Sequence, residues 1–347
     1  MRIHLRNSLF KIIASAITAL CCLKANAQIV FSTDDLPSQF GWHSRAYVNT
    51  GEVNISTRVG QPGGPQRWDF SQPLAAGEIV KRLDIMPTTN SWHGTNFPQA
   101  TYAERLTTEA DGAQSWSYYH IVSDQGRAYY GFYDSVGNPV NPLKAFQAAT
   151  IDLPHPILFG QTWSRIVDFE DVIDTGLFQL QIAVHFIAQA QVDAYGTLVL
   201  PRIGEVPALR VNELHAYELT DLSLGLPLGT QYIRNYYWLV RGIGKAVDLI
   251  SEAQTSTPPV QLSTAKTVLR VFEFSSRSVA DLHIHLEADR AILDWQLQTN
   301  TSGYRVEMLP NLALTNWQVV AEPTNNSWAE VLMPAEPQRF FRVFLKP

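Results

Sequence analysis

Apolar and polar residues alternate along most of this 347-residue chain, and the pattern is clearest between residues 177 and 192. Every second residue from Phe178 to Ala188 is apolar, while Gln179, Gln181 and His185 lie between them. A strand with this pattern buries one side and exposes the other to water. Because proline and glycine interrupt the alternation at short intervals and helical periodicity is almost absent, we expect an all-β protein.

The region from residue 177 to residue 250 is expected to fold as an antiparallel meander. Short connections that contain glycine, such as residues 241–244, separate its apolar runs and favour hairpins between neighbours. Upstream, residues 115–122 and 127–133 flank a Ser-Asp-Gln-Gly turn and predict another hairpin. The turn-like residues 193–196 are expected to end one strand before a short strand at 197–200 begins.

These patterns divide the chain into four parts. Residues 1–27 are a predicted signal peptide, and residues 28–252 are expected to form a large antiparallel β-sheet or sandwich domain. Residues 253–278 contain Pro258-Pro259 in a polar setting and predict a linker followed by a strand. Residues 279–347 show short strands at the spacing of a small β-sandwich.

The first 27 residues have the pattern of an export signal. Three basic residues, Arg2, Arg6 and Lys11, precede an apolar run, and small residues occupy Ala25 and Ala27. Cleavage is predicted after Ala27. We therefore expect a secreted protein that is extracellular or bound to the cell surface, with the periplasm as the remaining compartment.

Removal of the signal would change the chemistry of the chain. Both cysteines, Cys21 and Cys22, lie inside it, so the mature chain could form no disulfide and use no thiolate. Loss of its four basic residues leaves 22 Lys and Arg against 32 Asp and Glu, a net charge of −10. This charge argues against nucleic-acid partners. No later segment has the long apolar run of a membrane helix, so we expect no membrane insertion.

The C-terminal part resembles the fibronectin type III-like tail modules of bacterial secreted proteins. The resemblance rests on four motifs: Leu293-Asp294-Trp295, Tyr304-Arg305-Val306-Glu307, Asn316-Trp317 and Phe340-Phe341-Arg342-Val343. It implies a small β-sandwich in which a strand with a buried tryptophan packs beneath a closing aromatic strand.

The central part resembles a recurrent pattern in uncharacterised exported bacterial proteins. The motifs are Trp68-Asp69-Phe70-Ser71, Asp193-Ala194-Tyr195-Gly196-Thr197-Leu198 with Leu200-Pro201, Leu209-Arg210-Val211, and Tyr237-Trp238 followed by Gly242-Ile243-Gly244. This resemblance implies a fold and an exported location, and it carries over no catalytic residue.

Aromatic residues crowd the hairpin at 115–133 and form the first candidate binding site. Trp116, Tyr118, Tyr130 and Tyr133 are candidates for a platform on which sugar rings stack, because Tyr and Trp bury area while keeping a polar edge. The alternative is that these rings belong to the core. Trp42-His43 and Trp92-His93 are weaker instances of the same pattern.

Two further patterns could bind a metal. His283 and His285 would share one face of a strand and could ligate a divalent cation with a nearby carboxylate. The alternative is a solvated strand face. Apart from this metal, we expect no cofactor. Carboxylates at 168, 170, 171 and 174 could form a calcium loop, although a solvated acidic turn fits the spacing better.

The sequence does not decide whether the protein is an enzyme. It contains neither Gly-x-Ser-x-Gly nor His-Glu-x-x-His. We expect a secreted, non-catalytic protein that attaches to a surface or matrix, or binds a glycan, with an extracellular glycan or cell-surface component as its partner. The alternative is a secreted glycan-active hydrolase that uses two carboxylates.

Overall fold

The computed structural model describes residues 29–176, 178–275, 282–287, 289–295, 303–309, 318–331 and 339–346. The predicted signal peptide lies outside them. Within these ranges the regular structure is β-strand apart from three short 3-10 helices, η1 (Thr33–Asp35), η2 (Thr88–Asn90) and η3 (Gly94–Asn96). The all-β prediction is confirmed. No helix in the described ranges is long and apolar enough to cross a membrane.

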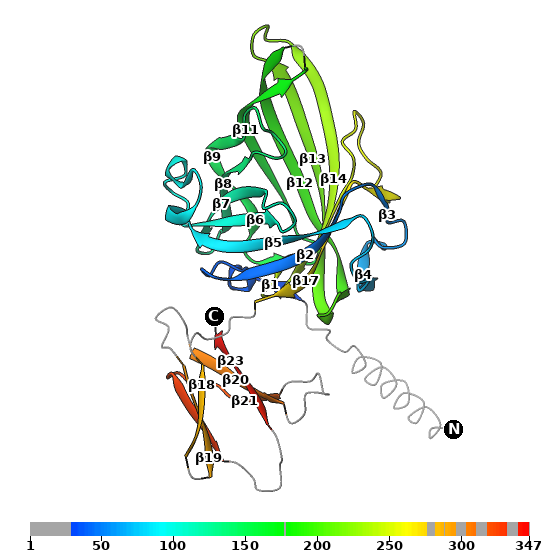
Figure 1. Cartoon of the computed structure of the whole chain (residues 1–347). Coiled ribbons are helices and arrows are strands. Elements are labelled where there is room, and N and C mark those ends of the chain that lie inside the picture. Colours follow the sequence, from blue (N-terminus) through cyan, green and yellow to red (C-terminus); the bar gives the residue numbers. More distant parts are fainter. Residues whose placement is uncertain are drawn as a thin grey trace, which may run out of the picture.

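One large sheet dominates the described chain (Figure 1). Twelve of its thirteen strands pair in the order β11 (Thr162–Asp174), β12 (Gln179–Leu200), β13 (Gly204–Asp221), β14 (Pro227–Val240), β15 (Gly244–Ile250), β17 (Thr267–Phe274), β2 (His43–Asn49), β5 (Glu78–Pro87), β6 (Tyr102–Thr108), β7 (Gln114–Val122), β8 (Gly126–Asp134) and β9 (Leu143–Pro154). These pairs are antiparallel, and β4 (Gly63–Asp69) runs parallel to the lower part of β12. The predicted meander corresponds to β12–β15, and the predicted hairpin corresponds to β7 and β8.

The strand expected within residues 253–278 is β17 (Thr267–Phe274), and it belongs to the large sheet. Residues 264–265 form β16, which pairs with β3 (Val53–Asn54), and β17 lies between β15 and β2. Val268 and Val271 are buried, and both belong to the same apolar cluster as Trp238 of β14 and Trp68 of β4, which favours a strand at this position. The large domain therefore extends to Phe274, beyond the expected boundary at residue 252.

The turn expected at residues 193–196 is a bulge within a continuous strand. β12 runs through to Leu200, and its register with β13 shifts between Val192 and Ala194. The cause is Asp193, whose carboxylate is buried because it accepts hydrogen bonds from Arg210 Nε and Nη2 at 2.8 and 3.0 Å. A bulge re-aims this side chain without ending the strand.

The sheet bends back on itself, so the two end strands of its path, β9 and β11, lie against each other (Figure 1). Lys144 Nζ lies 2.9 Å from Asp171 Oδ1, and the rings of Phe146 and Phe169 lie 6.1 Å apart. The sheet therefore has a concave face, where distant strands face each other, and a convex face, which points outward.

Apolar clusters close one end of the concave face and part of the convex face. On the concave side, β1 (Val30–Phe31) pairs with β10 (Ile157–Leu158), and Phe31 packs against Leu209 and Tyr237. On the convex side, residues of β4 and its preceding loop cover Trp238. The rest of the convex face of β11–β14 is left uncovered by these clusters.

The C-terminal module consists of two three-stranded sheets. One has the order β18 (His283–Glu287), β19 (Arg290–Asp294), β22 (Ser327–Val331), and the other has the order β21 (Gln318–Ala321), β20 (Gly303–Leu309), β23 (Phe340–Lys346). Its buried cluster joins residues of both sheets, with Leu293 and Trp295 facing Tyr304, Val306 and Val343.

Candidate functional site

The aromatic hairpin is built as predicted, but two of its four candidate rings lie in the core. Trp116 and Tyr118 are 2% and 0% exposed, and Phe97 stacks on Tyr118 at 3.9 Å. Tyr130 and Tyr133 are half-buried at the margin of the same cluster. A ligand could touch only these two of the four rings.

Trp92 adds an exposed ring beside this hairpin. It is 51% exposed, and its centroid lies 6.1 Å from Trp116 and 6.0 Å from Tyr133. His93 stacks on Tyr133 at 4.5 Å. These rings form a small aromatic edge rather than a flat strip, because the Trp92 ring is tilted against Trp116 and perpendicular to Tyr133.

The predicted histidine pair lies on an exposed edge strand. His285 Nδ1 lies 3.4 Å from Asp294 Oδ2, and its Nε2 lies 3.5 Å from Glu287 Oε1. His283 is also exposed on β18. Within the described residues, no three His, Cys, Asp or Glu side chains come together in a way that could hold a metal ion.

The predicted acidic turn is a strand, because its apolar residues alternate with the acids along β11. Asp168 faces the convex side, where its Oδ1 lies 2.6 Å from His185 Nδ1. Asp171 faces the opposite side and pairs with Lys144 at 2.9 Å. Asp171 therefore lies on the opposite face from the other three acids, and within the described residues these carboxylates form no group that could hold a metal ion.

A polar groove of about 600 Å³ lies on the convex face of β11–β14. Its lining residues are Thr162, Trp163, Ser164, Gln189, Ala190, Gln191, Asn212, Leu214 and Arg234. The pairing register arranges most of them in two rows across the sheet. The first row is Thr162, Gln191 and Asn212, and the second is Ser164, Gln189, Leu214 and Arg234. The groove is therefore a product of strand register, with rows about 7 Å apart along the strands.

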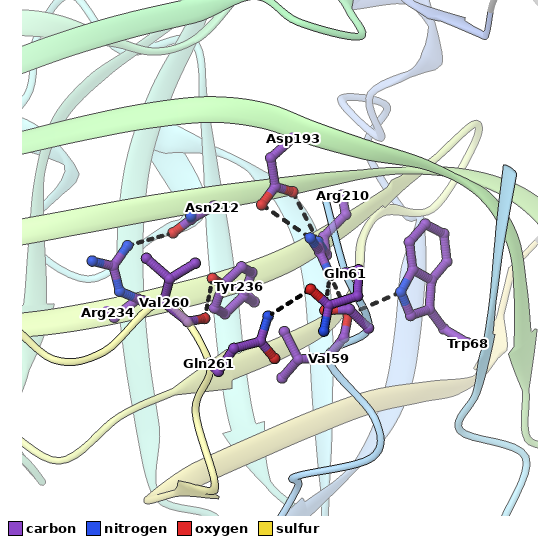
Figure 2. Close-up of polar contacts among 11 residues, drawn as sticks. Val59, Gln61, Trp68, Asp193, Arg210, Asn212, Arg234, Tyr236, Val260 and Gln261 are labelled. Atoms are coloured by element: carbon purple, nitrogen blue, oxygen red, sulfur yellow. Dashed lines mark hydrogen bonds and ion pairs between the residues drawn. The ribbon is translucent and has the colours of Figure 1, made fainter. Parts of the chain in front are cut away.

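Arg234 ends the second row of groove residues, and Figure 2 shows its contact with Asn212. Its Nη1 donates a hydrogen bond to Asn212 Oδ1 at 2.7 Å, and its Nε donates to the carbonyl oxygen of Pro258 at 3.1 Å. The residue is 7% exposed, yet no carboxylate among the described residues lies within ion-pair distance of it. A buried guanidinium held only by neutral oxygens is unusual, since buried charges are normally paired.

A rigid network supports the sheet beside Arg234. Tyr236 donates its hydroxyl proton to the carbonyl of Val260 at 2.6 Å, which fixes the loop before β16 to β14 (Figure 2). Arg210 binds Asp193 through both carboxylate oxygens and donates to the carbonyl of Val59. These contacts support the strands beneath the groove and use no amide that lines it; the Asn212 amide is bound by Arg234.

An apolar row borders the groove along the strands. The register aligns Ile166, Ile187, Ala216 and Tyr232 across β11–β14. Ile166 is 56% exposed, and the other three are half-buried. Polar rows and an apolar row therefore lie side by side on one surface.

The concave face carries a second polar cluster, and most of its charges are paired. Arg127 lies 2.6 Å from Asp152 and 2.9 Å from Glu104, and its guanidinium lies 4.2 Å from the ring of Tyr119. Trp163 Nε1 donates to the carbonyl of Asp152 at 3.2 Å, which ties β11 to β9. This cluster joins the facing halves of the curled sheet.

Two carboxyl groups of the concave cluster have pKa values displaced in opposite directions. Burial alone would raise the pKa of Glu213, but Arg165 at 3.0 Å and His215 outweigh it and hold that pKa well below its usual range. Burial raises the pKa of Asp248 to about 6, because Lys245 compensates it only in part. Asp248 Oδ1 makes no hydrogen bond to a described residue.

Sequence reasoning identified the polar side of β12 but missed the groove. The alternation puts Gln189 and Gln191 on the wet side of the strand. One further signal was present, because Arg234 and Asn235 interrupt an otherwise apolar and aromatic run that ends at Val240. What the sequence does not contain is the register that aligns them.

Comparison with protein-family models, with curated proteins and with solved structures found no match to this chain.

Proposed function

We propose that the protein is an exported, non-catalytic binding protein that holds a glycan in the convex groove of β11–β14. The observation that carries the proposal is the groove lining. Neutral amides and hydroxyls from three strands lie in two aligned rows, and a buried guanidinium closes one end.

The chemistry of the lining suits a sugar. Asn and Gln amides both donate and accept hydrogen bonds, which matches hydroxyl groups that do the same. The neighbouring row with Ile166 and Tyr232 offers apolar surface to the C–H side of a sugar ring. The rows run along a regular sheet, so the contacts are held in fixed positions before a ligand arrives, which lowers the entropic cost of binding.

The described lining favours binding over hydrolysis. A glycosidase needs two carboxyl groups on either side of the scissile bond, about 5–9 Å apart. The groove lining contains no Asp or Glu. This supports the non-catalytic reading over the two-carboxylate hydrolase, which stays the alternative function.

The C-terminal module fits a role in attachment. Two three-stranded sheets enclose Trp295 and Tyr304, and this arrangement supports the proposal that the module is fibronectin type III-like. The N-terminal export pattern supports an extracellular or cell-surface location, where such a module would meet a glycan-coated surface.

A glycan array probed with the mature protein tests the proposal. The paired change Gln189→Ala and Gln191→Ala should abolish retention, because it removes the central amides of both rows. Gln179→Ala with Gln181→Ala is the matched control, since these exposed glutamines lie on the same face of β12 outside the groove. Retention should be unchanged in the control.

Two results would contradict the proposal. Equal retention by both double variants would place any glycan site elsewhere. Release of soluble sugar from a retained glycan would identify a hydrolase instead of a binding protein.

A further inference from the structure

Four arginines in the described residues are buried, and one of them differs from the others. Arg127, Arg210 and Arg270 each have a carboxylate oxygen within 2.8 Å, from Asp152, Asp193 and Glu78 respectively. Arg234 is 7% exposed and has no such partner among the described residues. Among the described residues, the fold therefore compensates three buried guanidinium charges and gives the fourth no counter-charge.

Neutral oxygens satisfy only part of the donor capacity of Arg234. A guanidinium has five N–H donors. Nε and Nη1 are used by the carbonyl of Pro258 and by Asn212 Oδ1, whereas Nη2 makes no hydrogen bond to a described residue. Since Arg234 lines the groove, these contacts fix the guanidinium in orientation at the edge of the site.

The surroundings of the groove leave this positive charge available. The lining contains no acid, so an anion placed there would meet no opposing carboxylate. The nearest acid along the same face of β11 is Asp168, which lies beyond the apolar row and is 2.6 Å from His185. The chain as a whole carries a net negative charge, so the positive charge at this site is opposite in sign to that of the whole chain.

We propose that the glycan bound in the groove is an acidic one, and that Arg234 pairs with a carboxylate on its sugar units. The inference rests on the proposed glycan-binding function and names the class of glycan. A carboxylate is planar and presents two oxygens, which matches the fork of a guanidinium held in place by its neighbours. The groove amides would then bind the hydroxyls on either side.

Isothermal titration calorimetry with uronic-acid oligosaccharides tests this assignment. The probes are oligomers of galacturonate, glucuronate and mannuronate, each compared with its own methyl ester, which removes the charge and keeps the sugar. The mature wild-type protein should bind at least one acid form about tenfold or more tightly than its ester. That preference should weaken as salt increases.

Variants of Arg234 identify the residue responsible. Arg234→Gln should bring the affinities for acid and ester together, and Arg234→Lys should keep part of the preference because it keeps the charge without the fork. Arg67→Gln is the control, since Arg67 is an exposed arginine that does not line the groove. If Arg234→Gln fails to fold by circular dichroism, the wild-type comparison of acid and ester still decides.

The outcomes separate this inference from the proposed function. Equal affinity of the wild-type protein for acid and ester, or binding of neutral glycans only, would overturn the acidic-glycan assignment and leave glycan binding standing. Absence of binding to these probes and to every glycan of the array would overturn both. An acid preference that survives in Arg234→Gln would assign the charge recognition to another residue.

Discussion

The concave and convex faces of the same curled sheet both bury arginine, but they treat its charge differently. On the concave face Arg127 lies between Asp152 at 2.6 Å and Glu104 at 2.9 Å. In the convex groove the described partners of the Arg234 guanidinium are neutral oxygens, those of Pro258 and Asn212. An ion pair with both partners inside the protein joins strands: Arg127 joins β8 to β9 through Asp152 and to β6 through Glu104. The buried charge of Arg234, which has no counter-ion among the described residues, is the basis for the ligand proposed in the groove.

This difference separates stability from binding. Removal of one partner from a buried ion pair leaves an uncompensated charge in the interior, which costs about 3–5 kcal/mol. Removal of a guanidinium that has no counter-ion leaves only neutral groups behind. Substitutions on the two faces should therefore have effects of very different size.

The largest effect is expected for Asp152→Asn on the concave face. This change keeps the shape of the side chain but removes the carboxylate 2.6 Å from Arg127, and among the described residues only Glu104 would still pair with it. The free energy of unfolding measured with urea should fall by about 3 kcal/mol, the lower end of the cost of breaking a buried ion pair, because Glu104 still compensates part of the charge. A loss below about 1 kcal/mol would show that the concave pairs are not structural.

The second effect concerns Asp248, a carboxyl group of the concave face whose burial Lys245 compensates only in part. Burial raises its pKa from 3.8 to about 6, so the folded protein holds this proton more tightly than the unfolded chain. Between about pH 4 and pH 6 the unfolded state binds fewer protons, and stability falls as pH rises through that window. At roughly 1.4 kcal/mol per pH unit, the penalty reaches about 3 kcal/mol above pH 6.

Asp248→Asn should remove this penalty. Relative to the wild type, the variant should be more stable by up to about 3 kcal/mol at pH 7, and the difference should shrink toward zero near pH 4. Urea unfolding of both proteins across this range measures it. A difference that does not change with pH would contradict the assignment of the charge to Asp248.

Sequence reasoning succeeded where the controlling interactions are local. The alternation over 178–188 and the turn between residues 122 and 127 predict β12 and the β7–β8 hairpin, because side-chain period and turn residues act over a few positions. The same local reasoning placed a turn at residues 193–196. It failed there because the carboxylate of Asp193 is bound by Arg210, a partner on the next strand.

The groove and the central position of β17 depend on long-range register. Ser164, Gln189 and Arg234 come from three strands, and only the pairing of β11 through β14 brings them into one row. β17 pairs with β2, whose residues lie more than two hundred positions earlier in the chain. No periodicity within a single segment contains this information.

The smallest stability effect is expected for Arg234→Gln, even though the change should remove the recognition of charge. The variant loses hydrogen bonds to Asn212 and to the carbonyl of Pro258, each worth about 0.5–1.5 kcal/mol, but it no longer buries an uncompensated charge. Because these terms oppose each other, urea unfolding should change by about 1 kcal/mol or less. Asp152→Asn, measured in the same way, provides the scale. A loss from Arg234→Gln as large as that from Asp152→Asn would mean that Arg234 is a structural charge like Arg127, and the contrast between the two faces would no longer support a ligand in the groove.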